Sequence, residues 1–165
     1  MLAASPVQVL VRLPAITIPA DSASFSTTVD LTSARETILK LGPGNDVVLD
    51  LDGIETETSP AVYFEVYVHV GNQPRGRTVG NLTLYGTGIR NEARGTFQPA
   101  HVALVITEQL RAVLETSSSV TVTFVSQGAG GGPPPRSTSA VTIRTPTVRI
   151  EPRPRQAGLL GALAW

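Results

Sequence analysis

Apolar and polar residues alternate along most of the chain with a period of two. Segments of about five to eight residues, rich in Val, Ile, Leu, Phe and Thr, are separated by clusters of Gly, Pro, Asn and Asp. Such alternation is typical of antiparallel strands that bury one face. The sequence therefore predicts an all-β protein, an antiparallel β-sandwich of jelly-roll or C2-like type with about seven or eight strands and one short helix.

The clearest alternation lies in residues 62–70. Val and Phe side chains occupy every second position, which predicts a strand with an apolar inner face. The opposite face of this strand carries four other side chains: Tyr63, Glu65, Tyr67 and His69. Aromatic rings with polar tips suit ligand binding, so this face is a candidate site for a carbohydrate or another small ligand. The alternative is that a loop, a strand edge or a partner protein covers it.

A second strong segment spans residues 46–52, with apolar side chains on one face and polar ones on the other. Four carboxylates lie in or just after it: Asp50, Asp52, Glu55 and Glu57. A calcium loop is one interpretation of this acidic composition, but the spacing does not fit the EF-hand pattern. We therefore expect a solvated strand face followed by an acidic turn.

Proline marks an irregularity near the N-terminus. Pro14 follows the alternating segment 7–13 and precedes a second short apolar segment with Ile16 and Ile18. Because proline has no N–H to donate to a strand ladder, this position predicts a bulge or an edge strand.

Helical spacing is confined to two short segments. Thr107 is a suitable N-cap, and apolar residues recur at helical spacing after it, so we expect a helix over residues 108–115 that closes one end of the sandwich. A single helical turn is expected over residues 33–41, before the Gly-Pro-Gly sequence that follows.

The C-terminal residues differ in composition from the rest of the chain. We expect residues 1–151 to form the sandwich domain, residues 152–155 to form a stiff Pro/Arg spacer, and the remainder to form an apolar tail. Residues 157–165 carry no charged side chain. The large apolar residues of this tail are candidates for docking on a partner: Leu159, Leu160, Leu163 and Trp165.

The charge balance argues against two classes of partner. Thirteen Lys and Arg residues offset thirteen Asp and Glu residues, whereas nucleic acids and anionic membranes both require an excess of cations. We therefore expect no nucleic-acid partner and no membrane partner. The chain shows no secretory leader and no apolar stretch approaching the roughly 20 residues that cross a bilayer, which makes a soluble, by default cytoplasmic, protein the expectation.

Few residues are suited to catalysis or metal binding. The chain has no cysteine and two histidines, His69 and His101, so one copy cannot supply a thiolate site or a metal centre of three imidazoles. The G-x-S-x-G motif of serine hydrolases is also absent. We therefore expect no catalytic residue, no metal site and no cofactor.

Five segments follow one another in a distinctive order. The second reads Tyr63-Phe64-Glu65-Val66-Tyr67-Val68-His69, and the others are Val48–Glu55, Leu104–Leu110, Ser119–Val125 and Val141–Glu151. Over most of residues 6–151, this series resembles the carboxy-terminal domain of plant-type polyphenol oxidases, the tyrosinases and catechol oxidases. The central strand of that domain carries a Lys-Phe-Asp-Val signature, in which this chain has Tyr63 in place of Lys.

The resemblance implies a β-sandwich that lies over the dicopper site of a catalytic domain and keeps the enzyme latent until it is removed or displaced. The copper-binding histidines of the family's catalytic domain are missing from this chain. We therefore expect a non-enzymatic shielding or accessory domain whose partner is the catalytic domain of a type-3 copper oxidase. Two alternatives remain open. One is a structural assembly or interaction module that oligomerises or docks on another protein through its apolar tail, and the other is a sandwich that binds a carbohydrate or small ligand at Tyr63 and Tyr67.

Overall fold

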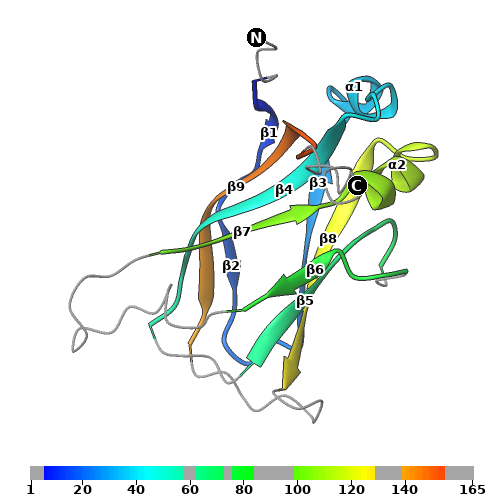
Figure 1. The fold of residues 1–165 in the computed structure, drawn as a ribbon. Helices are drawn as coiled ribbons and strands as arrows, with labels where there is room; N and C mark the ends of the chain where they lie inside the picture. The colour runs from blue at the N-terminus through cyan, green and yellow to red at the C-terminus, as the bar shows by residue number, and fades with distance from the viewer. Residues whose placement is uncertain (1–5, 58–61, 73–75, 84–98, 129–138, 155–165) are drawn as a thin grey trace, which may run out of the picture.

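The computed structural model describes residues 6–57, 62–72, 76–83, 99–128 and 139–154. These residues form two antiparallel β-sheets that face each other across a single apolar core (Figure 1). The predicted all-β sandwich is therefore confirmed.

The first sheet is built around two long strands at its centre. Its strand order is β1-β9-β4-β7, and β2 pairs with the same edge of β9 as β1 does. The strands are β1 (Gln8–Arg12), β2 (Ile16–Ile18), β4 (Asn45–Glu55), β7 (Ala100–Val105) and β9 (Val141–Pro152). β1 and β2 thus form one edge of this sheet, and β7 forms the other.

The second sheet has the strand order β3-β8-β5-β6. Its strands are β3 (Ser24–Asp30), β5 (Val62–His69), β6 (Gly80–Leu82) and β8 (Ser119–Gly128). β5 pairs with β8 over its full length, from Val62 opposite Gly128 to His69 opposite Thr121. This continuous pairing fixes which side chains share the outer face of the sheet, because the side chains of opposite residues point to the same side.

Two short helices lie together at one end of the sandwich (Figure 1). They are α1 (Arg35–Leu39) and α2 (Thr107–Leu114). Leu110 and Leu114 of α2 and Ile38 of α1 are buried in the core, so the helices cover this end of the apolar interior. Arg35 Nε also donates to the carbonyl of Leu114 at 2.8 Å, which satisfies one of the free carbonyls at the end of α2.

The expectation that Thr107 caps α2 through its side chain was wrong. Thr107 is the first helical residue, and Ile106 occupies the N-cap position without a side-chain hydrogen bond. The Thr107 hydroxyl instead accepts a hydrogen bond from the Val47 backbone N–H at 2.9 Å and donates to Asp46 Oδ1 at 3.0 Å. Contact with β4 therefore competes with capping, and it ties the start of the helix to the first sheet.

Alternation in the sequence accounts for the core. Inner-face side chains of β4, β5 and β8 are almost fully buried, among them Val47, Leu49, Leu51, Phe64, Val66, Val122 and Phe124. Burial of each such side chain stabilises the fold by about 1.5–3 kcal/mol before the cost of ordering the chain. The inner face of the first sheet therefore packs against the inner face of the second, and the outer faces of the described strands are exposed for function.

Two prolines lie side by side in the first sheet. Pro14 separates β1 from β2, as predicted, and Pro146 lies within β9, which runs unbroken from Val141 to Pro152. The Pro146 carbonyl accepts from the Leu13 N–H at 3.0 Å, so the nitrogen of Pro146 faces the same edge. Pro146 thus lacks its N–H at the point where the edge strand is interrupted. The sheet therefore loses few backbone hydrogen bonds.

A bulge shifts the pairing of β1 between Val9 and Val11. The period-two pattern predicts that Val7, Val9, Val11 and Leu13 share one face. This prediction is wrong, because the extra residue at the bulge breaks the alternation. Leu10, Val11 and Leu13 pack partly against the core, whereas Val7 and Val9 stay exposed on the outside.

The described residues contain nine strands and two helices, against the predicted seven or eight strands and one helix. The expected turn over residues 33–41 contains the short helix α1. Within the described ranges, no helix combines the length and the apolar character needed to span a bilayer.

Candidate functional site

The two histidines lie on opposite outer faces of the sandwich. His69 ends β5 in the second sheet, and His101 follows the first residue of β7 in the first sheet. Each imidazole is hydrogen-bonded within the fold. The chain therefore presents two separate polar faces, each with one histidine.

The outer face of the second sheet is neutral for the most part and rich in hydroxyl and aromatic groups. We call it the tyrosine face. Cross-strand pairing defines its members as Tyr63, Glu65, Tyr67 and His69 on β5, Thr121, Thr123, Val125 and Gln127 on β8, and Ser24, Ser26 and Thr28 on β3. Tyr63 and Tyr67 are half-buried, so each ring leaves part of its surface open to solvent.

Glu65 organises the centre of the tyrosine face. Tyr67 Oη donates to Glu65 Oε2 at 2.9 Å, and Gln127 Nε2 donates to the same oxygen at 3.2 Å. The hydrogen bond to the Glu65 carboxylate raises the pKa of Tyr67 above its ordinary value, and partial burial adds to this rise. The Tyr67 ring is thereby held in one orientation before anything binds.

His69 is the buried end of this face, with 3% of its surface exposed. His69 Nε2 lies 2.7 Å from Thr123 Oγ1, which in turn lies 2.7 Å from Ser26 Oγ, and His69 Nδ1 lies 3.4 Å from the Val70 carbonyl. A neutral imidazole satisfies all these groups if Nδ1–H donates to Val70, Thr123 donates to Nε2 and Ser26 donates to Thr123. The chain of hydrogen bonds from His69 through Thr123 to Ser26 thus links three strands of the sheet, β5, β8 and β3.

The outer face of the first sheet is held by ion pairs, and we call it the ion-pair face. Its members are Asp46, Asp50, His101, Arg149, Glu151 and Arg153. The Asp50 carboxylate is 6% exposed and contacts His101 Nε2 through Oδ1 and Arg149 Nη1 through Oδ2, the latter at 3.2 Å. Arg149 Nη2 also pairs with Glu151. The expectation of a solvated strand face was therefore wrong for Asp50, because neighbouring strands supply its partners.

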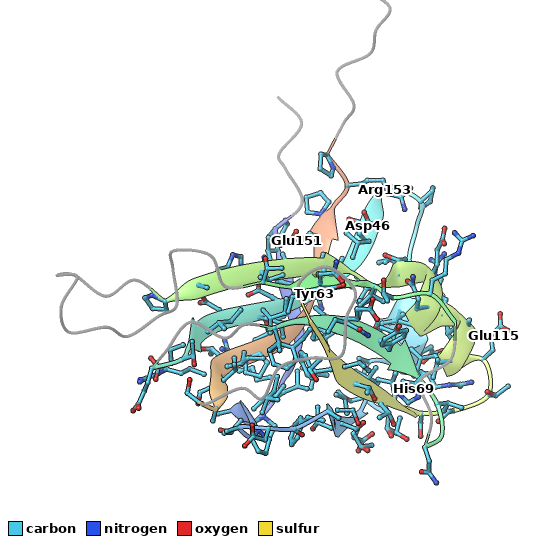
Figure 2. All side chains as sticks on the ribbon, turned by 90° about the horizontal axis from the view of Figure 1, so that it is seen from below. Asp46, Tyr63, His69, Glu115, Glu151 and Arg153 are labelled. Atoms are coloured by element: carbon cyan, nitrogen blue, oxygen red, sulfur yellow. The ribbon has the colours of Figure 1, made fainter. Side chains whose placement is uncertain are left out.

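The end of β9 is fixed to β4 at this face. Arg153 Nη2 donates to Asp46 Oδ1 at 2.9 Å, Arg153 Nε donates to Oδ2 at 3.2 Å, and the Arg153 N–H donates to the Gly44 carbonyl at 2.8 Å. The hydrogen bond from Arg153 lowers the pKa of Asp46, against a smaller opposing effect of burial. Figure 2 shows Asp46, Glu151 and Arg153 close together at one end of the molecule.

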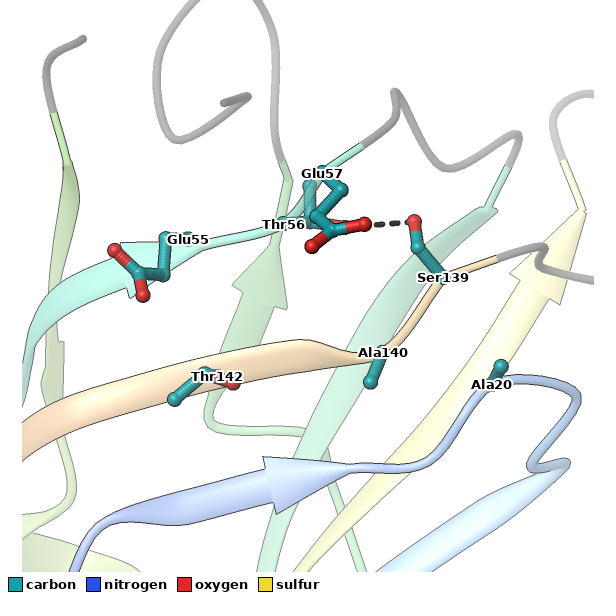
Figure 3. A pocket seen from close by; sticks show the side chains of 7 residues that line it. All are labelled: Ala20, Glu55, Thr56, Glu57, Ser139, Ala140 and Thr142. Atoms are coloured by element: carbon teal, nitrogen blue, oxygen red, sulfur yellow. Dashed lines mark hydrogen bonds between the residues drawn. The ribbon is translucent and has the colours of Figure 1, made fainter. Parts of the chain in front are cut away.

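A pocket of about 440 Å³ opens where β4 ends and β9 begins (Figure 3). Its lining is polar and partly acidic: Ala20, Glu55, Thr56, Glu57, Ser139, Ala140 and Thr142. The hydroxyls of Thr56 and Ser139 lie 3.0 Å apart, and Arg144 Nη2 donates to Glu55 Oε1 at 2.6 Å. Such a lining suits a small polar molecule.

The structure places the acidic segment on more than one surface. Asp50 belongs to the ion-pair face, Asp52 Oδ1 accepts from the Gly53 N–H at 2.9 Å, and Glu55 and Glu57 line the pocket. Within the ranges that the structure describes, no three His, Asp or Glu side chains come together as a metal-binding group.

Of the residues singled out from the sequence, Tyr63, Tyr67 and His69 share one face as expected, although His69 is buried there. Leu159, Leu160, Leu163 and Trp165 lie outside the described residues. The cluster of Asp50, His101 and Arg149 was missed. The alternating acidic residues of β4 could have indicated a charged face. Their basic partners could not be identified, because they depend on the pairing of β4 with β9 and β7, which the sequence alone does not reveal.

The fold defines a class, the antiparallel β-sandwich of two sheets with helices at one end. No protein-family model and no curated protein matches this chain. Among solved structures, the chain is similar to latent apple tyrosinase, with 22% sequence identity and a TM-score of 0.48. The match covers 83% of this chain and 27% of the apple chain, so this chain spans about a quarter of the length of that tyrosinase.

Proposed function

We propose that this protein is a non-catalytic accessory domain that docks on the catalytic domain of a type-3 copper oxidase and shields its dicopper site. The proposal starts from the ordered series of segments that resembles the carboxy-terminal domain of plant-type polyphenol oxidases. In the structure these segments are β4, β5, β8, β9 and the turn from β7 into α2. The segments that carry the resemblance thus include the central strands of both sheets. These are the strands that two proteins with a shared fold would have in common.

The observation that carries the docking role is the ordered tyrosine face. Tyrosine is enriched at protein interfaces, because its ring buries a large area at a low cost in conformational entropy. Glu65 and Gln127 hold the Tyr67 hydroxyl in place, which lowers the ordering cost of binding further. We therefore assign the contact with the partner to Tyr63, Tyr67 and the hydroxyl groups around them.

In this role the domain contributes no chemistry of its own. A domain seated over the entrance of a metal site excludes the substrate sterically, so turnover falls with the fraction of enzyme that carries the domain. Both histidines of the chain are engaged within the fold, His69 with Thr123 and His101 with Asp50. Inhibition should therefore follow mass action and leave the copper content of the oxidase unchanged.

The test mixes the purified chain with a tyrosinase catalytic domain from the same genome and measures diphenol oxidation together with co-elution on gel filtration. The expected result is inhibition that saturates with added chain. The double variant Tyr63→Ala/Tyr67→Ala should weaken inhibition by about tenfold or more, the scale of an interface hot spot. Arg12→Ser, on an exposed residue of the first sheet, is the matched control and should inhibit like the unchanged chain.

Two results would count against the proposal. Full turnover with no co-elution at saturating chain would reject docking altogether. Equal weakening by Arg12→Ser and by the double tyrosine variant would reject the tyrosine face as the contact surface while leaving docking in place.

The same face supports a second candidate function, binding of a neutral glycan. Tyr63 and Tyr67 are four residues apart on one strand, so their rings stand about 13 Å apart along the sheet. Hydroxyls of β3 and β8 lie beside them, including Ser26 and Thr121. Affinity electrophoresis in gels containing neutral polysaccharides distinguishes the two functions, because retardation that is lost in Tyr63→Ala would favour the glycan.

A further inference from the structure

We propose that the free edge of β3 pairs with the same edge of a second copy of this chain, antiparallel and centred on Thr27, so that the second sheets of two sandwiches join into one continuous sheet. β3 lies two strands away from Tyr63 and Tyr67 on β5, so this dimer does not depend on the docking role assigned to the tyrosine face. Three features of β3 favour it: open backbone groups, the absence of devices that protect an edge strand, and side chains that complement themselves.

The backbone of β3 bonds alternately to the neighbouring strand and to the open edge. Directly before the strand, the Ala23 carbonyl accepts from the Ser126 N–H at 3.0 Å. Directly after it, the Leu31 N–H donates to the Ser118 carbonyl at 2.9 Å. Because the register between these two bonds is unbroken and the bonding has a period of two, the odd-numbered residues of β3 bond to β8. The N–H and C=O groups of the even-numbered residues therefore point to the open edge: Ser24, Ser26, Thr28 and Asp30.

These edge groups have few partners within the described part of the protein. β3 is the end strand of the second sheet, and β8 is the one described strand that pairs with it. Ser22 Oγ donates to the Ser24 carbonyl at 2.9 Å. The N–H and C=O groups of Ser26 and Thr28 make no hydrogen bond with another described residue. β3 thus offers a row of donors and acceptors to an added strand.

β3 also lacks the features that keep edge strands from pairing. It has seven residues without proline, glycine or a basic side chain, and no bulge interrupts its register. In the first sheet, a bulge after Val9 and Pro14 interrupt the edge formed by β1 and β2, and the pairing of β7 with β4 shifts between Leu51 and Ile54. β6 has three residues. Of the edges that the described strands form, the edge of β3 is therefore the best suited to pair with another strand.

The side chains of β3 complement themselves when a second copy runs antiparallel to the first. Pairing centred on Thr27 produces these cross-strand pairs: Phe25 with Val29, Ser26 with Thr28, and Ser24 with Asp30. Apolar side chains thus meet on the inner side of the sheet and polar ones on the outer side, where a serine hydroxyl can donate to a carboxylate. Phe25 and Thr27 are only half-buried in one copy, so the added strand would cover surface that is still open.

The charges of β3 favour the antiparallel orientation. Asp30 is the single charged residue of the strand. In the antiparallel pair the two Asp30 residues are six positions apart along the strands, or about 20 Å, well beyond the Debye length of about 8 Å at physiological ionic strength. A parallel pair in the same register would place the two carboxylates side by side. The formal net charge of the chain is zero, so two copies do not repel each other as a whole.

Thr28→Pro tests the edge without changing the bonds to β8. The Thr28 N–H points to the open edge, so the single copy should tolerate its loss, whereas an added strand would lose a donor and meet the proline ring. Thr28→Ala is the matched control, because it removes the same side chain and keeps the N–H. Sedimentation equilibrium from micromolar to millimolar protein should show a monomer–dimer equilibrium for the unchanged chain and for Thr28→Ala. Association of Thr28→Pro should be weaker by about tenfold or more, since the symmetric dimer loses the bond twice.

Two results of this experiment would overturn the proposal. An unchanged chain that stays monomeric at every concentration would leave the edge of β3 to a strand of another protein. Equal association of the proline and alanine variants would place the dimer interface elsewhere on the molecule. Circular dichroism verifies that both variants stay folded.

A single introduced cysteine gives a second test that does not depend on proline, because the chain contains no cysteine of its own. In the dimer the two copies of Thr27 form a pair without mutual backbone hydrogen bonds, with Cα atoms about 4.5 Å apart, within the range of a disulfide. Thr27→Cys should therefore form a disulfide-linked dimer under mild oxidation. Thr83→Cys, just after β6 at the opposite edge of the same sheet, is the control and should link at least about tenfold more slowly, although Thr83 is the more exposed residue. Equal rates in the two variants would overturn the proposal.

Discussion

On the outer face of the first sheet, acidic and basic side chains of neighbouring strands meet, whereas on the outer face of the second sheet hydroxyl, amide and aromatic groups meet. The two faces have the same origin, since both are the polar halves of alternating strands. Asp50 and Arg149 represent the first kind of face, and His69 and Thr123 represent the second.

The difference lies in what each face requires of its partners. Asp50 is stable in its buried position only while His101 and Arg149 are present, because an unpaired buried carboxylate is costly. Thr123 can donate or accept, so the hydroxyl network adapts to either tautomer of His69. The stability that the ion-pair face contributes should therefore fall strongly on loss of a charge, in acid and in salt. The stability that the tyrosine face contributes should fall mainly on loss of a hydroxyl.

The largest effect is expected for Asp50→Asn. The change removes the charge that Arg149 and His101 face and should lower the free energy of unfolding by about 2 kcal/mol. Asp52→Asn is the matched control on the same strand face. Asp52 is exposed and its carboxylate accepts from the Gly53 N–H, which the side-chain oxygen of asparagine can still do, so the cost of this change should stay within about 0.5 kcal/mol. Urea unfolding measures both, and equal costs would show that the pairing of Asp50 contributes little.

On the tyrosine face the corresponding change is Thr123→Val, with an expected cost of about 1–1.5 kcal/mol. Valine keeps the shape of threonine but leaves His69 Nε2 buried without its partner and Ser26 without its acceptor. Thr121→Val, two residues earlier on the same outer face, is the control and should change stability by less than about 0.5 kcal/mol. A comparable loss in both variants would mean that β-strand packing, and not the hydroxyl network, determines the cost.

The comparison also explains how much the sequence could predict. The inner faces followed from alternation alone, because burial selects apolar residues at every second position, as in Val66 and Val68 of β5. The outer faces depend on which strands become neighbours. Arg149 is about a hundred residues from Asp50 in the chain, and only the pairing of β4 with β9 brings them together.

Two local errors have the same physical basis. Thr107 has the right residue type for an N-cap, but its hydroxyl finds Asp46 and the Val47 N–H on a strand that is distant in sequence. Val7 and Val9 alternate as expected, but the bulge after Val9 changes the face that follows. In both cases a tertiary contact overrides a local preference. The tyrosine face was anticipated because all its aromatic members lie on one strand.

Acid should separate the two faces further. The hydrogen bond from Arg153 lowers the pKa of Asp46 below its ordinary value of 3.8, so the stability that this pair adds is fully present above that value and is lost as the pH falls through the lowered folded value. Asp46→Asn should cost about 0.5 kcal/mol at neutral pH, and the difference from the unchanged chain should vanish in strong acid. Urea unfolding over an acid pH series measures this difference. Arg12→Gln is the control and should show no such convergence, and a constant difference for Asp46→Asn at every pH would refute the assignment.

The smallest effect is expected for Arg144→Gln, at the exposed margin of the first sheet. Arg144 donates to Glu55 at 2.6 Å, and this hydrogen bond raises the pKa of Arg144, but the guanidinium is in solvent and the pair is screened. The melting temperature should fall by less than about 1 °C at low salt, and the difference should disappear near 1 M NaCl, where the Debye length is about 3 Å. In the same salt series the deficit of Thr123→Val should stay constant, because neutral hydrogen bonds are not screened. If salt instead removed the Thr123→Val deficit and spared that of Arg144→Gln, the division into a charged face and a neutral face would be the wrong description of this sandwich.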